Sequence, residues 1–340
     1  MADSVALAEP QHMETGKLGR KRDLFRSYEQ NKESELAEAR EARRYYHDKQ
    51  WTDTERKKLR ARGQQDTVRN RIKRKIDVLV GVEQRRRRDP KAYPRNPQDE
   101  QSATTATMGL RFACEKNLWE QVASQAAHCG FTSGIGAAWI GIEADARGVN
   151  EVAIRIVPED RFFYDPRSVQ HDFSDARYVG EHIWQDIEDA VAAHPKQEKE
   201  LRAMVDSHGS SLTTHTVEED YAHLWGDFER QRVRIVQMYE KKPLAPAMQG
   251  FGWYYCKFTG DLELEGAWSP YKDTYGIPEH PYEAWTCYID ERGQRYGVVR
   301  TMKSVQDEIN HRASKVLWRL STRQMHTRRN ALLDPDETRR

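Results

Sequence analysis

The period of the hydrophobic pattern changes along this chain of 340 residues, and that change constrains the fold more than any other feature. From 22 to 128, apolar residues recur at the three- and four-residue steps of an amphipathic helix. From 138 to 156 they alternate with charged or small residues, which is the period of a half-buried strand. From 298 to 320 the helical period returns. We therefore predict an α+β chain with helices on both sides of a β-rich middle.

The same patterns place individual elements, and a chain of this length is expected to form two or three subdomains. Helices are predicted over 22–50, 67–84, 100–128, 185–193, 196–206 and 296–326. Strands are predicted over 138–142, 152–156, 161–164, 178–184 and 233–239, the first two paired across Ala146-Arg147-Gly148. Gly260-Asp261 is a plausible hairpin turn between 254–258 and 262–265. Thr52 is expected to cap a short helix.

The net charge of +1, from 55 basic and 54 acidic residues, argues neither for nor against a nucleic-acid partner. The distribution of charge is more informative, because basic residues gather at 69–75, at 85–88 and at 311–329. Phosphate recognition is mostly electrostatic, so Arg85, Arg86, Arg87 and Arg88 are candidates for contact with DNA or with acidic groups of a neighbouring subunit.

The last predicted helix combines an apolar stripe with a basic one. Its apolar stripe is a candidate surface for packing between subunits and contains Val298, Met302, Val305, Ile309, Val316 and Leu320. Opposite this stripe we predict a basic stripe for contact with DNA or a subunit, containing Arg312, Lys315, Arg319 and Arg323. An apolar face of this length requires a partner.

No motif for catalysis or cofactor binding stands out. The chain has no P-loop and no zinc-ligand spacing, and its four cysteines are widely spaced, as expected for reduced thiols. Asp165, Asp172 and Asp175 could together hold Mg²⁺ or Ca²⁺, although the same residues are ordinary turn formers. No apolar run approaches the length of a transmembrane helix, so no membrane contact is expected.

Four segments, in the same order along the chain, resemble the portal proteins of short-tailed phages and related prophages. The first is Ala42-Arg43-Arg44-Tyr45-Tyr46-His47-Asp48-Lys49-Gln50-Trp51-Thr52, and the second is the stretch from Asn70 through Gly81 to Pro94-Arg95. The third combines Asp165-Pro166-x-Ser168 with Asp172-x-Ser174-Asp175-Ala176-Arg177. The fourth is the stretch from Arg295-Tyr296-Gly297 to Lys315. Together they cover about 42 to 320. No single segment is decisive, but their shared order makes the resemblance specific.

The resemblance implies a domain organisation. It suggests a flexible arm at 1–21, a wing-like α/β domain at 22–225, a clip-like β-rich module at 226–290, a stem or channel-proximal helix at 291–329 and a tail at 330–340. The aromatic residues Trp253, Tyr254, Tyr255 and Phe258 then become candidates for clip contacts. Members of this family are usually longer, and their channel loop, crown and barrel have no counterpart here.

The resemblance also implies a function without catalysis or a cofactor. Such proteins form rings, usually of about twelve subunits, at one capsid vertex and conduct double-stranded DNA during packaging and ejection. The implied partners are the terminase large subunit, a tail adaptor or head-tail connector protein, and the major capsid and scaffolding proteins. The implied location is the virion, after synthesis in the bacterial cytoplasm.

Two alternatives of other classes remain open at this point. One is a metal-dependent phage nuclease that uses Asp165, Asp172 and Asp175. The other is a monomeric virion scaffold or adaptor that binds its partner through the helix at 296–326.

Overall fold

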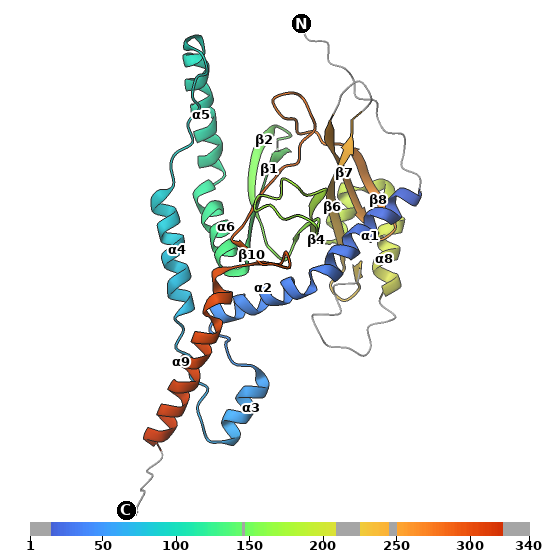
Figure 1. The fold of residues 1–340 in the computed structure, drawn as a ribbon. Coiled ribbons are helices and arrows are strands. Elements are labelled where there is room, and N and C mark those ends of the chain that lie inside the picture. The colour runs from blue at the N-terminus through green and yellow to red at the C-terminus, as the bar shows by residue number, and fades with distance from the viewer. Residues whose placement is uncertain (1–14, 145–146, 209–224, 245–249, 322–340) are drawn as a thin grey trace, which may run out of the picture.

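The computed structural model describes residues 15–144, 147–208, 225–244 and 250–321, in which two larger antiparallel sheets and a small strand pair accompany a set of helices (Figure 1). The helices are α1 (Thr15–Asn31), α2 (Glu33–Tyr46), α3 (Asp53–Ala61), α4 (Ile72–Arg86), α5 (Glu100–Lys116), α6 (Trp119–Ser133), α7 (Ile187–Ala193), α8 (Glu198–His208) and α9 (Val298–Ser321). The strands are β1 (Ile135–Ala144), β2 (Asn150–Val157), β3 (Phe162–Tyr164), β4 (Tyr178–Asp186), β5 (Gly226–Asp227), β6 (Arg232–Pro243), β7 (Phe251–Thr259), β8 (Leu262–Trp268), β9 (Tyr282–Thr286), β10 (Tyr288–Ile289) and β11 (Arg295–Tyr296). The α+β class is therefore confirmed.

The larger sheet has the order β3-β4-β6-β7-β8, with β5 beside β6. The predicted hairpin at Gly260-Asp261 is confirmed: Thr259 pairs with Leu262, and Gly260 has the positive φ of +54° that such a turn favours. In this sheet β4, which precedes the predicted boundary at 225/226, pairs with β6, which follows it. The 22–225 and 226–290 segments thus share one sheet within the subunit.

The smaller sheet has the order β2-β1-β9. The predicted pairing of 138–142 with 152–156 is confirmed, with Ile140 opposite Ile154. Its third strand, β9, comes from the distant 282–286 segment and pairs with the first half of β1. Gly136 is required in β1, because a Cβ there would lie 2.6 Å from the Trp285 indole nitrogen and 2.4 Å from the Ala126 carbonyl.

The main core lies between α1 and the larger sheet. Phe25 and Tyr28 of α1 are buried against the aromatic strand β3, and the rings of Phe25 and Phe163 meet edge to face. Side chains on the two faces of β6 pack in two different cores. Val236 belongs to the main core, whereas Val233 and Ile235 pack with α7 and α8 in a second one.

A third core joins the helices. Tyr45 of α2, Ile72 and Ile76 of α4, and Val299 of α9 are buried together, with Phe131 of α6 packed against them. This cluster fixes the start of α9 to the body, whereas the later turns of α9 extend away from the sheets (Figure 1). It also holds the base of the arm formed by α4 and α5.

Two predicted helices are interrupted, and in each case a polar side chain at the break bonds to another part of the fold. The 22–50 helix breaks at Lys32, whose ammonium is buried and donates to Glu35 and to the Gly293 carbonyl. The 100–128 helix breaks at Leu118, which has φ +50°, beside Asn117. The Asn117 side chain exchanges hydrogen bonds with the backbone of β2 and so occupies part of that sheet edge. The cap predicted at Thr52 is confirmed as a capping box with Glu55.

Candidate subunit and nucleic-acid interface

Beyond the apolar contacts of its first turns, α9 packs on its own chain largely through polar side chains. Gln306 and Asn310 are buried at 2% exposure, and each uses its side-chain oxygen to accept a backbone N–H: Gln306 from Arg71 at 2.8 Å, Asn310 from Arg69 at 3.0 Å. Asn310 also donates to the Gln50 side chain at 2.6 Å. These side chains satisfy backbone groups that a loop leaves unpaired. They form what we call the polar seat of α9, which fixes the loop before α4.

The exposed face of α9 carries both the apolar and the basic residues that were predicted to make contacts. Val305, Val316 and Leu320 are 58%, 54% and 78% exposed, and Arg312, Lys315 and Arg319 are exposed beside them. The predicted separation of an apolar stripe from an opposing basic stripe is therefore wrong. The polar seat occupies the inward face of α9, so the apolar and the basic residues both lie on its outward face.

The other apolar candidates on α9 are already partly covered by the chain itself. Val298 and Met302 pack against the helical core, and Ile309 is half-buried. Arg323 lies outside the described residues. Arg312 is exposed and forms an ion pair with Glu308 one turn earlier, so its charge is partly offset.

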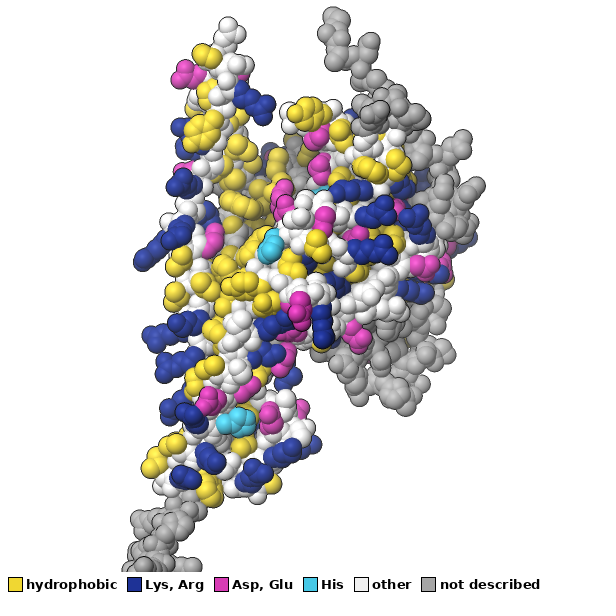
Figure 2. All heavy atoms as spheres, viewed as in Figure 1, with side chains coloured by type: hydrophobic (Ala, Val, Ile, Leu, Met, Phe, Trp, Pro, Cys, Tyr) yellow, Lys and Arg dark blue, Asp and Glu magenta, His cyan; other side chains and the backbone are white. Residues whose placement is uncertain are grey.

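The basic run at 69–75 is brought close to α9 by the polar seat. The backbones of Arg69 and Arg71 are bonded to α9, while their side chains are exposed, as are those of Lys73, Arg74 and Lys75. Figure 2 shows Lys and Arg side chains along the side of the molecule formed by α4, α5 and α9, with hydrophobic side chains among them. The run 69–75 and the basic residues of α9, which are distant in sequence, therefore bring positive charge to the same side of the molecule.

The run 85–88 lies at the far end of α4. Arg85, Arg86 and Arg88 are exposed and remain contact candidates. Arg87 differs, because its guanidinium is held by Glu83 and donates to the Glu120 carbonyl at 2.7 Å. We infer that Arg87 fastens α4 to α6, and sequence alone could not separate it from its three neighbours.

The helix α5 is a second surface that the rest of the chain leaves largely uncovered. None of its residues is buried, and Met108, Leu110 and Phe112 are 66%, 46% and 67% exposed. Figure 1 shows α5 extending past the sheets as an arm. An isolated helix of this length is marginal in water, so this surface is a candidate for contact with a partner.

The proposed clip contacts require a correction. Trp253, Tyr254 and Phe258 are 5%, 4% and 0% exposed in the main core, and Tyr255 is packed against it. These aromatic residues lie on both faces of β7 and pack inside this subunit, because both faces of that strand are covered. They offer little surface to another protein.

The three aspartates of the nuclease hypothesis serve a loop. Asp165 accepts the backbone N–H groups of Arg167 and Arg177, Asp175 accepts from Ser168 and Val169, and Asp172 accepts from Ser174. These bonds lower the pKa of Asp172; for Asp175, bonds from Ser168 and Val169 lower the pKa despite an opposing effect of burial. Within the described ranges, no group of three or more possible metal ligands is found.

A buried arginine, missed in the sequence, ties this loop to the rest of the fold. Arg295 is 1% exposed, donates to Ser168 and Thr286, and lies over the Phe173 ring at 4.0 Å. Its backbone N–H donates to buried Glu35 at 2.8 Å. The sequence did not indicate this role, because a single arginine before a helix is usually exposed.

Comparison with known proteins gives one positive result. A family model described as Phage P22-like portal protein matches residues 22–340, and no curated protein matches the chain. None of the helices described has the length and apolar sequence needed to cross a bilayer. The match spans both sheets, the α4–α5 arm and α9, and it confirms the resemblance seen in the four segments. The chain belongs to the Phage P22-like portal protein family, whose members are non-enzymatic structural proteins of the phage particle.

Proposed function

We propose that this chain is a ring subunit, with about twelve copies at one capsid vertex, through which double-stranded DNA is packaged and ejected. The observation that carries the proposal is the outward face of α9. Its exposed apolar and basic residues lie on a helix whose inward face is already occupied by the polar seat. A ring offers each copy of α9 a neighbour for the apolar residues and leaves cationic side chains for the channel.

The α4–α5 arm supports the same proposal from another part of the chain. Its apolar side chains gain cover only if another polypeptide packs on them, because the arm extends beyond its own sheets. The surface of the ring would then dock the terminase large subunit during packaging and the tail adaptor afterwards. Major capsid and scaffolding proteins would contact its periphery.

DNA contact in such a channel is independent of sequence and depends on salt. The cationic candidates are the run 69–75, Arg85, Arg86 and Arg88, and the α9 residues Arg312, Lys315 and Arg319. Each phosphate contact that is removed should lower the slope of log affinity against log salt by about one.

The test replaces one exposed valine on α9. Val305→Asp should shift the protein from rings to small species in sedimentation, because it puts a charge into an apolar contact between subunits. The matched control is Val149→Asp at the β1–β2 turn, a valine of similar exposure (55%). If both variants form rings as readily as the wild type, α9 does not form the subunit interface.

A further inference from the structure

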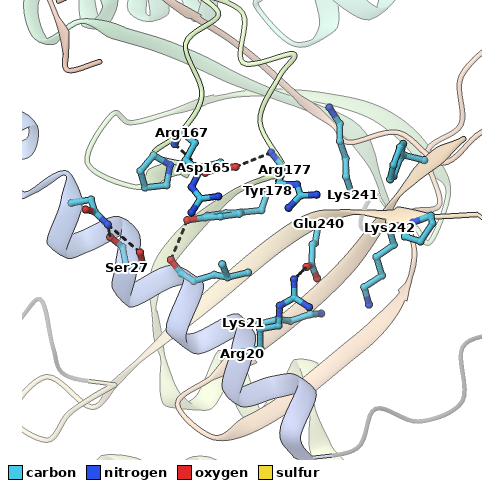
Figure 3. Close-up of a pocket in the computed structure, with 15 residues that line it drawn as sticks. Arg20, Lys21, Ser27, Asp165, Arg167, Arg177, Tyr178, Glu240, Lys241 and Lys242 are labelled. Atoms are coloured by element: carbon cyan, nitrogen blue, oxygen red, sulfur yellow. Dashed lines mark hydrogen bonds and ion pairs between the residues drawn. The ribbon is translucent and has the colours of Figure 1, made fainter. Parts of the chain in front are cut away.

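Six cationic side chains line one cleft of about 930 Å³ between α1, the loop after β3, and β6 (Figure 3). They are Arg20, Lys21, Arg167, Arg177, Lys241 and Lys242. The lining contains only two carboxylates, Asp165 and Glu240. The cleft lies on the larger sheet and involves neither α9 nor the α4–α5 arm, so the ring proposal does not explain it.

The two carboxylates offset only part of this charge, because six cationic residues line the cleft. Asp165 is 6% exposed and uses its two oxygens to accept the backbone N–H groups of Arg167 and Arg177, at 3.0 and 3.3 Å. Glu240 lies 3.8 Å from Arg20. Among the described residues, the Arg167 and Arg177 guanidiniums form no ion pair, while Asp165 holds their backbones in place on either side of itself. Asp165 therefore fixes where both arginines start from the main chain, and their exposed guanidiniums stay available for a ligand.

Two lysines bring further positive charge to the floor of the cleft. The ammonium groups of Lys21 and Lys242 both lie over the Tyr254 ring, at 4.7 and 3.6 Å from its centre. Lys21 is 2% exposed, and no oxygen or nitrogen accepts a hydrogen bond from its ammonium. Figure 3 shows Lys21 reaching from α1 toward the sheet. A buried ammonium without an anionic partner is costly, and a bound anion would offset that cost.

We propose that this cleft binds a phosphate-bearing ligand of nucleotide size. Arg167 and Arg177 supply the planar forks that match phosphate oxygens, and Lys21 and Lys242 supply charge beneath them. Phe251, which is 63% exposed at the rim, offers a ring on which a base can stack. The volume suits one or two nucleotides and is too small for a duplex. The phosphate can come from a free nucleotide or from a single strand.

Calorimetric titration of the full chain, without metal ions, tests the proposal. The probes are dATP, inorganic tripolyphosphate, decathymidylate and a deca-glutamate peptide. We expect saturable binding of dATP and tripolyphosphate, and an affinity loss of about tenfold or more in the Arg167→Ala/Arg177→Ala variant. Both residues are exposed, so the variant should fold. The control, Arg60→Ala/Arg95→Ala, removes two exposed arginines elsewhere and should bind as the wild type does.

The probes also separate the possible ligands. Decathymidylate that binds more tightly than dATP and competes with it would identify a single strand as the source of the phosphate. Weaker decathymidylate would identify a free nucleotide, and either result supports the proposal. It is overturned if no phosphate compound binds saturably, if the control loses as much affinity as the cleft variant, or if the glutamate peptide binds as tightly as tripolyphosphate.

Discussion

At the scale of single residues, buried polar groups join distant parts of this fold. Arg295 is the clearest case, because it joins the 165–177 loop, β9 and α2 through Ser168, Thr286 and Glu35. Two aromatic rings flank its guanidinium. The arrangement is fully internal, so its role is to hold the subunit together.

Arg295→Met should therefore destabilise the subunit. The substitution leaves buried acceptors without a donor, and we expect a loss of about 3 kcal/mol or more in the free energy of unfolding. The check is urea denaturation followed by tryptophan fluorescence. Arg292→Met, an exposed arginine nearby, is the control and should change stability by no more than about 0.5 kcal/mol. Equal effects in the two variants would contradict the structural role.

Gly134 supports a second residue-scale prediction. Its φ is +113°, and an added Cβ would lie 2.7 Å from the backbone of Tyr296 just before α9. Gly134→Ala should cost more than the strain of about 1 kcal/mol that a positive φ alone imposes. Gly148→Ala, at φ +77° with open space around it, measures that strain by itself. Thermal unfolding should give a lower Tm for Gly134→Ala than for Gly148→Ala, and the reverse order would exclude the close approach.

Stability should fall in mild acid because two half-buried histidines are held in neutral form. Burial, followed by the charge of Lys241, lowers the pKa of His280 to about 4, and burial lowers the pKa of His182 well below 6.5. The folded pKa is the lower one, so this stabilisation is complete above about pH 6.5 and is lost as the pH falls toward 4. Urea midpoints should drop over that window. His280→Gln should flatten the drop, whereas exposed His171→Gln should leave it unchanged.

At the scale of elements, α9 shows what periodicity could and could not predict. Its start was predictable, because apolar residues recur at helical spacing, while the predicted end at 326 lies outside the described residues. Its orientation was not, because the inward face uses Gln306, Asn310 and Ser314 to satisfy loop backbone groups. A pattern based on hydrophobicity assigns such residues to solvent. The i, i+4, i+8 spacing of these three polar residues was the available signal.

Asn310→Leu tests the polar seat. Leucine has similar size but leaves the Arg69 N–H and the Gln50 side-chain oxygen without a partner, which should cost about 1–3 kcal/mol. Val316→Leu on the outward face of the same helix should cost almost nothing in the isolated subunit. Hydrogen exchange at 69–71 should accelerate in the first variant only. Unchanged exchange would show that the seat does not hold the loop.

Among the strands too, local pairing was predictable from the sequence and distant pairing was not. Local pairs such as β1 with β2 and β7 with β8 follow from turn residues and alternation, and the sequence predicted both. The pairing of β1 with β9 joins segments more than a hundred residues apart and has no local signature. The same holds for the cleft, whose cationic residues come from α1, the loop after β3 and β6.

At the scale of the whole molecule, the subunit has a sheet-rich body and two helical parts, α9 and the α4–α5 arm, that extend from it (Figure 1). Both helical parts expose apolar side chains, and Figure 2 shows cationic groups along the same side. This distribution agrees with family membership, because the family implies an oligomeric ring in which such surfaces meet neighbours. The domain roles of wing, clip and stem remain proposals for the assembled ring.

The central claim is that these surfaces close a ring, and the mass of the purified full chain in solution, followed by electron microscopy of the largest species, tests it most directly. The account predicts a closed ring of about twelve subunits with a central channel. A species that stays monomeric at high protein concentration and low salt, with no rings in the images, would contradict it.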